Sequence, residues 1–128
     1  MNDSVRLSDH AIEGLKFHCG MDVAMHHLGG KWKTVVLYYL IDGKKRFNEI
    51  KKRIPNITEK MLSIQLKSLE EDGIIKKEVF NTKPPLKVEY SLTDFGKTLI
   101  PLLESLVDWG HFVVKEKSYT MHTTKSIQ

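Results

Sequence analysis

The sequence has very little cysteine and no long hydrophobic run. Cys19 is the only cysteine among 128 residues, so no intrachain disulfide can form, which is typical of a protein from a reducing compartment. No apolar run approaches the roughly 18 residues that cross a bilayer, and the first residues lack the basic and then apolar order of a secretory signal. We therefore expect a cytoplasmic protein with a single folded domain.

Motifs of catalysis and of metal binding are also missing. The chain shows no glycine-rich phosphate loop, no nucleophile elbow and no obvious pair of carboxylates for acid–base work. His18 and Cys19 are chain neighbours, which point in different directions on regular backbone and make a poor catalytic dyad. The six histidines lack the spacing of a zinc motif around the sole cysteine. We expect neither an enzyme nor a bound metal or cofactor, and metal-dependent thermal stabilisation would contradict the second expectation.

Positive charge is present, and it is concentrated in the middle of the chain. The net charge is +4, but the segment from Lys31 to Lys87 holds 14 Lys and Arg against 7 Asp and Glu. The flanks hold 6 basic and 9 acidic residues. Such a segment attracts polyanions, because neutralised phosphates release counterions. Charge alone fits a solubility surface equally well, so it indicates a nucleic-acid partner only together with a motif.

The expected order of elements predicts an α+β, mostly helical fold. Predicted helices span 8–15, 22–28, 31–41, 48–54 and 58–72, and predicted strands span 74–81 and 87–92. Asn48 and Thr58 are expected to cap the fourth and fifth helices, and Gly73 ends the fifth. A helix, a tight turn, a longer helix and then a hairpin are the layout of a winged helix-turn-helix.

A final helix, capped by Thr93 and reaching about Glu116, has more apolar surface than one core needs. Pro101 is expected to kink it. A helix that is apolar on two sides usually needs another partner, so we expect a homodimer. The predicted interface residues are Leu99, Leu102, Leu103, Leu106, Trp109 and Val113. The polar tail 117–128 is expected to be flexible and to follow a DNA-binding domain that spans 1–116.

The helix predicted over 58–72 has one apolar and one polar face. Leu62, Leu66 and Leu69 share a narrow sector, which we assign to the core. A helix in the major groove of DNA needs short polar or basic side chains near its N-terminal half. Most amphipathic helices merely expose such a face to water, but the position between a turn and a hairpin favours DNA. The candidate base-reading residues are Thr58, Lys60, Ser63, Ile64 and Lys67.

Basic residues around this helix are candidates for phosphate contacts, which fix position without reading sequence. They precede the fourth helix, lie on it, or lie at the hairpin. The set comprises Lys44, Lys45, Arg46, Lys51, Lys52, Arg53, Lys83 and Lys87.

Several motifs occur in an order that is typical of one family. They are Leu28–Trp32, Arg46–Ile50, Ile57–Leu62, Leu66–Ile74 and Pro84–Thr93, followed by Gly96 and Trp109-Gly110. Over about residues 19–112 the chain resembles the HxlR family of bacterial transcription regulators, a winged-helix group related to MarR. The resemblance implies a homodimer that uses its N- and C-terminal helices and recognises an inverted repeat, often close to its own promoter. The two recognition helices should then lie about 34 Å apart.

The resemblance also gives Cys19 a candidate role. Some members of the family sense oxidants or electrophiles through a cysteine just before the helix with the Gly-Gly-Lys-Trp motif. Helix N-termini favour the reactive thiolate form, and a protonated His18 would add positive charge. Many members have proline after this cysteine, where this chain has Gly20. Free cysteines are also commonly buried and inert, so both interpretations stay open.

Two other functions remain open at this point. A winged helix can contact protein rather than DNA, and a lack of salt-sensitive DNA binding would favour that function. The other open function is the binding of a small aromatic effector in a crevice of the dimer. Trp32, Tyr38, Tyr39 and Trp109 are candidates to line such a crevice, although core packing explains these residues equally well.

Overall fold

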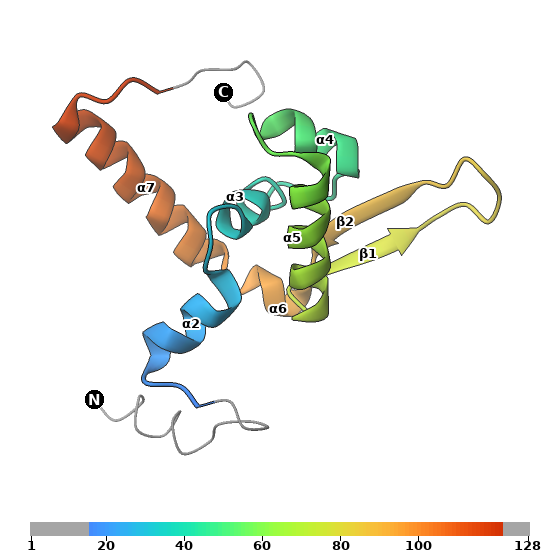
Figure 1. The fold of residues 1–128 in the computed structure, drawn as a ribbon, viewed down its shortest axis with the longest axis horizontal. Coiled ribbons are helices and arrows are strands. Elements are labelled where there is room, and N and C mark those ends of the chain that lie inside the picture. Colours follow the sequence, from blue (N-terminus) through green and yellow to red (C-terminus); the bar gives the residue numbers. More distant parts are fainter. Residues whose placement is uncertain (1–15, 122–128) are drawn as a thin grey trace.

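Helices and a two-stranded hairpin make up the structure, with the hairpin projecting from the side opposite α2 and α7 (Figure 1). The computed structural model describes residues 16–121, so the helix predicted over 8–15 and most of the predicted tail lie outside the described residues. The elements are α2 (Gly20–Leu28), α3 (Lys33–Tyr38), α4 (Phe47–Arg53), α5 (Glu59–Glu71), β1 (Ile75–Val79), β2 (Val88–Leu92), α6 (Asp94–Lys97) and α7 (Ile100–Lys117). The predicted α+β winged helix-turn-helix is confirmed.

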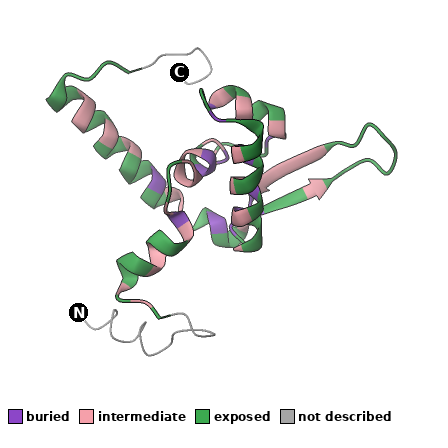
Figure 2. Cartoon of the chain, in the orientation of Figure 1, coloured by how far each residue is buried: buried purple, intermediate pink, exposed green. Residues whose placement is uncertain are grey.

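The hydrophobic core lies between α3, α4, α5 and the base of the hairpin. Leu62, Leu66 and Leu69 form the buried face of α5, as their spacing predicts. Buried positions concentrate at the centre of the molecule, whereas α2 and the far half of α7 are largely uncovered (Figure 2). The buried apolar residues are Leu28, Val36, Leu37, Leu40, Ile50, Ile54, Ile57, Leu62, Leu66, Leu69, Ile74, Ile75, Leu92 and Leu103.

The hairpin is antiparallel, with Ile75 opposite Leu92 and Val79 opposite Val88. Ile75 and Leu92 are buried and anchor its base, while every residue of the loop 80–87 is exposed. Lys45 extends the sheet with a single bridge, because its backbone N–H and C=O both pair with Tyr90, at 2.9 and 2.8 Å. The segment before α4 is thereby fixed to β2.

Two predicted helix caps are confirmed, and a third is wrong. The Met61 N–H donates to Thr58 Oγ1 (3.0 Å), and the Gly96 N–H donates to Thr93 Oγ1 (2.9 Å). The predicted cap at Asn48 lies inside α4, which begins at Phe47. At that end the Arg46 N–H donates to the Glu49 carboxylate (2.7 Å), because a side chain three residues into a helix can satisfy an open backbone donor.

The long final helix predicted from Thr93 is two helices, α6 and α7. Pro101 is the second residue of α7 and does not kink a helix interior; its missing N–H has no helical partner at that position anyway. Gly96 in α6 lies so close to the residue that precedes β1 that a Cβ atom would overlap the Ile74 carbonyl oxygen. This close approach fixes the direction in which α7 leaves the core.

Candidate nucleic-acid interface

The exposed face of α5 carries the predicted base-reading side chains. All five candidates are exposed, and Ile64 retains 49% of its surface. Lys60, Ser63, Ile64 and Lys67 fall within a sector of about 100° at the usual helical rotation. Thr58 stands apart, since its hydroxyl oxygen accepts the Met61 N–H as the helix cap. The structure thus brings four of the five together on one strip of α5.

The predicted phosphate-contact residues separate into exposed and internal groups. Arg46, Lys52, Lys83 and Lys87 are exposed, and Lys51 is half-buried on α4.

Lys45 is a correction. Its side chain is 11% exposed, and its ammonium donates to Asp42 Oδ1 (2.7 Å) and the Gly43 carbonyl (3.3 Å). Lys45 therefore stabilises the turn after α3 and is not available to a phosphate.

The same turn engages Arg53, which is half-buried. Its guanidinium lies 4.0 Å from Asp42 Oδ2 and 5.9 Å from the centre of the Tyr39 ring. The hydrogen bond from Lys45 is the main cause that lowers the pKa of Asp42 below its usual value, with the charges of Lys45 and Arg53 adding to it. Asp42 therefore remains ionised between two cations, and this network connects the turn after α3 to the end of α4.

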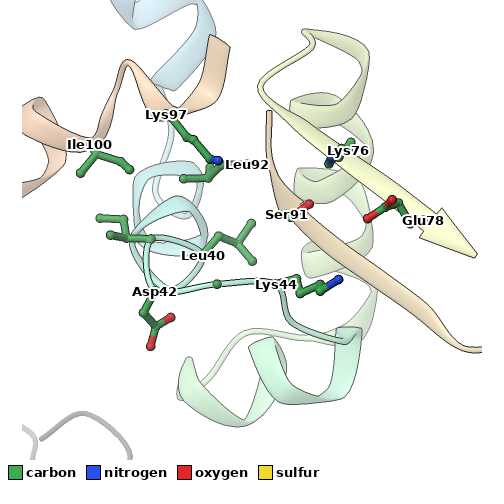
Figure 3. A pocket seen from close by; sticks show the side chains of 11 residues that line it. Leu40, Asp42, Lys44, Lys76, Glu78, Ser91, Leu92, Lys97 and Ile100 are labelled. Carbon is green, nitrogen blue, oxygen red and sulfur yellow. The ribbon is translucent and has the colours of Figure 1, made fainter. Parts of the chain in front are cut away.

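Two hollows flank the hairpin. One, of about 550 Å³, lies between α4 and the hairpin and includes Arg46, Asn48, Lys52 and Asn81 in its lining. The other, of about 380 Å³, lies at the base of the hairpin, where Lys44, Lys76 and Lys97 reach it from three different segments (Figure 3). Basic side chains thus lie around the hairpin as well as on α5.

Cys19 lies where the sequence indicates, directly before α2. It is the N-cap residue, half-buried, with a free thiol that does not cap the helix. Its carbonyl accepts the Val23 N–H (3.1 Å), and the His18 N–H donates to Asp22 Oδ2 (2.9 Å).

The predicted interface residues on α7 are divided between the core and the surface. Leu102, Leu106 and Trp109 are exposed, with Trp109 at 65%, and Leu99 and Val113 are half-buried. Leu103 is a correction: it is 2% exposed and belongs to the core of the single chain. Exposed apolar residues outside the predicted set include Met21, Met25, Phe95 and Phe112.

The aromatic crevice suggested by the sequence is only partly assembled. A hollow of about 290 Å³ is lined by Tyr38 and Tyr39 together with Leu103 and Leu106, without Trp32 or Trp109. Within residues 16–121, no group of three His, Cys, Asp or Glu side chains is placed to hold a metal ion. No helix in this part of the chain is long and apolar enough to cross a membrane.

The arrangement of α4, α5 and the hairpin matches a known family. A family model described as HxlR-like helix-turn-helix matches residues 27–118. The chain belongs to the HxlR family. The HxlR resemblance of the sequence is confirmed, and the chain is a helix-turn-helix transcription regulator.

Relatives and solved structures agree with this membership. YdeP of Bacillus subtilis, an uncharacterised helix-turn-helix-type transcriptional regulator, is 54% identical over 92 residues, which cover 72% of this chain and 71% of that protein. The redox regulator HypR in its reduced form is 46% identical with a TM-score of 0.72, covering 77% of this chain and 98% of that one. The reduced transcriptional regulator YodB from B. subtilis is 38% identical with a TM-score of 0.61, covering 70% and 86%.

Proposed function

We propose that this HxlR-family regulator is a cytoplasmic homodimer that binds an inverted-repeat operator, with α5 of each subunit in a major groove. One observation carries the proposal: Lys60, Ser63, Ile64 and Lys67 form an exposed strip on α5, and the hairpin that follows α5 has an equally exposed loop. Short polar side chains reach base edges there, and Ile64 suits a thymine methyl group. Arg46, Lys51, Lys52, Lys83 and Lys87 lie on the flanking elements and would contact phosphates.

Dimerisation is supported by the apolar surface that α2 and α7 leave uncovered. Met21, Met25, Leu106 and Trp109 are among the exposed residues on these two helices. Large exposed apolar patches on soluble proteins commonly mark sites of association. A two-fold dimer through these helices presents two copies of α5, which matches the symmetry of an inverted repeat.

Selection from a random DNA pool tests this function, because it needs no defined operator at the start. Reduced protein is incubated with the pool, and bound duplexes are amplified and sequenced over several rounds. We expect a two-fold symmetric motif with half-sites about one helical turn, or about 34 Å, apart. An enriched single half-site would contradict the homodimer, and absence of any enriched motif would contradict sequence-specific binding.

A response to oxidants or electrophiles through Cys19 is the second part of the proposal. It is supported by the position of the free, half-buried thiol at the start of α2 and by similarity to HypR, which is named a redox regulator. The thiolate is the reactive form of cysteine. Treatment with hypochlorite or with a quinone should weaken operator binding by the wild type and leave Cys19→Ser unaffected. Equal release of both proteins would show that Cys19 is not the sensor.

A further inference from the structure

Two lysines lie near one aromatic ring and one carboxylate where the strands of the hairpin end and its loop begins. The ammonium of Lys44 lies 5.2 Å, and that of Lys87 5.7 Å, from the centre of the Phe80 ring. The Lys44 ammonium lies 3.7 Å from Glu89 Oε1, and the Lys87 ammonium lies 3.9 Å from Glu89 Oε2. Because cations are attracted to aromatic faces, ring and carboxylate hold the same two ammonium groups. We call these four residues the Phe80 cluster.

The cluster joins two parts of the chain. Lys44 comes from the connection between α3 and α4 and extends toward the hairpin (Figure 3), whereas the other three members belong to the hairpin. The Phe80 N–H donates to the Lys87 carbonyl (2.8 Å), which holds these two residues opposite each other beyond the last strand pair. The Phe80 cluster therefore connects the segment before α4 to the hairpin.

A glutamate at position 89 destabilises the sheet unless nearby cations offset its negative charge. Glu89 lies directly opposite Glu78 in the antiparallel register, and like charges in that position destabilise a sheet. The Glu89 side chain is only 16% exposed, so its carboxylate has also lost part of its hydration. In the described part of the chain Glu89 forms two ion pairs and Glu78 forms none. The two lysines are thus what stabilises the charge at position 89.

Both lysines of the cluster remain able to bind a further anion. Their side chains are 54% exposed for Lys44 and 45% exposed for Lys87. An ammonium group has three donors, and separations of 3.7 and 3.9 Å from Glu89 exceed the usual hydrogen-bond range. The attraction to Glu89 therefore orients the ammonium groups without occupying their donors.

We propose that Glu89 is a positioning residue for DNA binding: it holds Lys44 and Lys87 near Phe80, ready to contact backbone phosphates of the duplex. This inference rests on the proposed function. A free lysine loses rotamer freedom when it contacts DNA, and a lysine that is already held loses less. Phosphate contacts of fixed geometry favour one register on the duplex. Glu89 thereby favours the operator over unrelated DNA, although its own charge repels both.

Glu89→Gln and Glu78→Gln are a matched pair for the test, because each removes one negative charge from opposite positions on one face of the hairpin. Loss of charge alone strengthens binding to every duplex alike. We expect Glu78→Gln to do only this. Glu89→Gln should in addition lower the ratio of operator affinity to scrambled-duplex affinity by about tenfold, since two lysines lose their set geometry. Equal ratios in the two variants would overturn the proposal.

Proton NMR of the free protein provides a readout that does not depend on DNA. The ring current of Phe80 should shift the ε-methylene protons of Lys44 and Lys87 upfield, and the same spectra report whether each variant is folded. We expect these shifts to be lost in Glu89→Gln and kept in Glu78→Gln. Retention of the shifts in a folded Glu89→Gln protein would overturn the proposal.

Variants of the lysines keep the test decisive if Glu89→Gln fails to fold. Lys44→Gln and Lys87→Gln should each lower the affinity ratio, and the double variant should lose less than the sum, because both residues depend on one carboxylate. Additive losses would contradict a shared positioning residue. If the wild type itself shows no preference for the selected duplex, the proposed function fails instead, so the two failures are distinct.

Discussion

His27 and Asp72 connect α2 to the C-terminal end of α5 through a contact of 2.9 Å between Nδ1 and Oδ2. Asp72 is the C-cap of α5. His27 lies in the last turn of α2, the helix that begins after Cys19. A change at the N-terminus of α2 therefore has a direct structural link to the helix that carries the candidate base-reading residues.

Breaking this link should cost little stability. Both side chains are about one-third exposed, and exposed ion pairs contribute about 0–1 kcal/mol. We expect His27→Gln and Asp72→Asn each to lower the free energy of unfolding by less than about 1 kcal/mol, and the double variant to lose no more than either one. Urea denaturation at pH 6 measures this. Fully additive losses would show that the two residues do not interact.

The lowered pKa of Asp42 gives stability a dependence on pH. A carboxyl group with a depressed pKa in the folded state stabilises the fold above its unfolded pKa, and this contribution disappears as pH falls through the folded pKa. We expect Asp42→Asn to be less stable than the wild type at pH 7, by about 1 kcal/mol or less because Asp42 is exposed. The difference should shrink as pH falls below about 3.9, the usual pKa of an aspartate, and should vanish once the folded carboxyl group is protonated as well. Thermal melts across this range provide the measurement; a difference that does not change with pH would contradict the assigned ion pair.

Substitutions at two nearby leucines of α7 should affect the stability of the fold and the dimerisation of the protein separately. Leu103→Ala should lower the free energy of unfolding by about 2–5 kcal/mol, since it opens a cavity in the core. Leu106→Glu changes a residue that is 46% exposed and should leave a folded monomer. Sedimentation velocity and thermal melts distinguish these outcomes. A dimer that survives Leu106→Glu would place the interface elsewhere.

Side chains on the exposed strip of α5 should differ in what they contribute to DNA binding: some to sequence specificity and others to charge-driven affinity. Ile64→Ala should weaken operator binding by about 1 kcal/mol and leave binding to a scrambled duplex unchanged, because it removes a base contact. Lys67→Gln should reduce the slope of log affinity against log salt by about 1 if Lys67 contacts a phosphate. Glu71→Gln, exposed near the end of α5, is the control. Equal effects of Ile64→Ala on both duplexes would contradict base reading by this residue.

Local features of the fold were predictable from the sequence. Thr58 and Thr93 cap helices as expected because a cap depends on only a few neighbouring residues. The buried face of α5 follows directly from the spacing of its leucines. The start of α7 could also have been predicted from Pro101, because proline is common in the first turn of a helix. The apolar period across 93–116 instead favoured one continuous helix.

Features that depend on distant contacts were not predictable. Lys45 is buried because the turn after α3 brings Asp42 to it, and nothing in the basic run 44–46 distinguishes it from its neighbours. Leu103 lies in the core and Leu102 on the surface, which depends on where α7 begins and how it leaves Gly96. Phe80 lies near Lys44 and Lys87 because of the register in which the two strands pair. The sequence of the proline-containing loop does not determine that register.

Fluorescence anisotropy of the reduced wild-type protein tests the central claim most directly. The protein is titrated into the selected duplex and into a scrambled duplex of equal length, at several salt concentrations. We expect saturable binding to the selected duplex at least about 10³ tighter than to the scrambled one, weakening steeply as salt increases. Equal affinity for the two duplexes at every salt concentration would contradict a sequence-specific regulator.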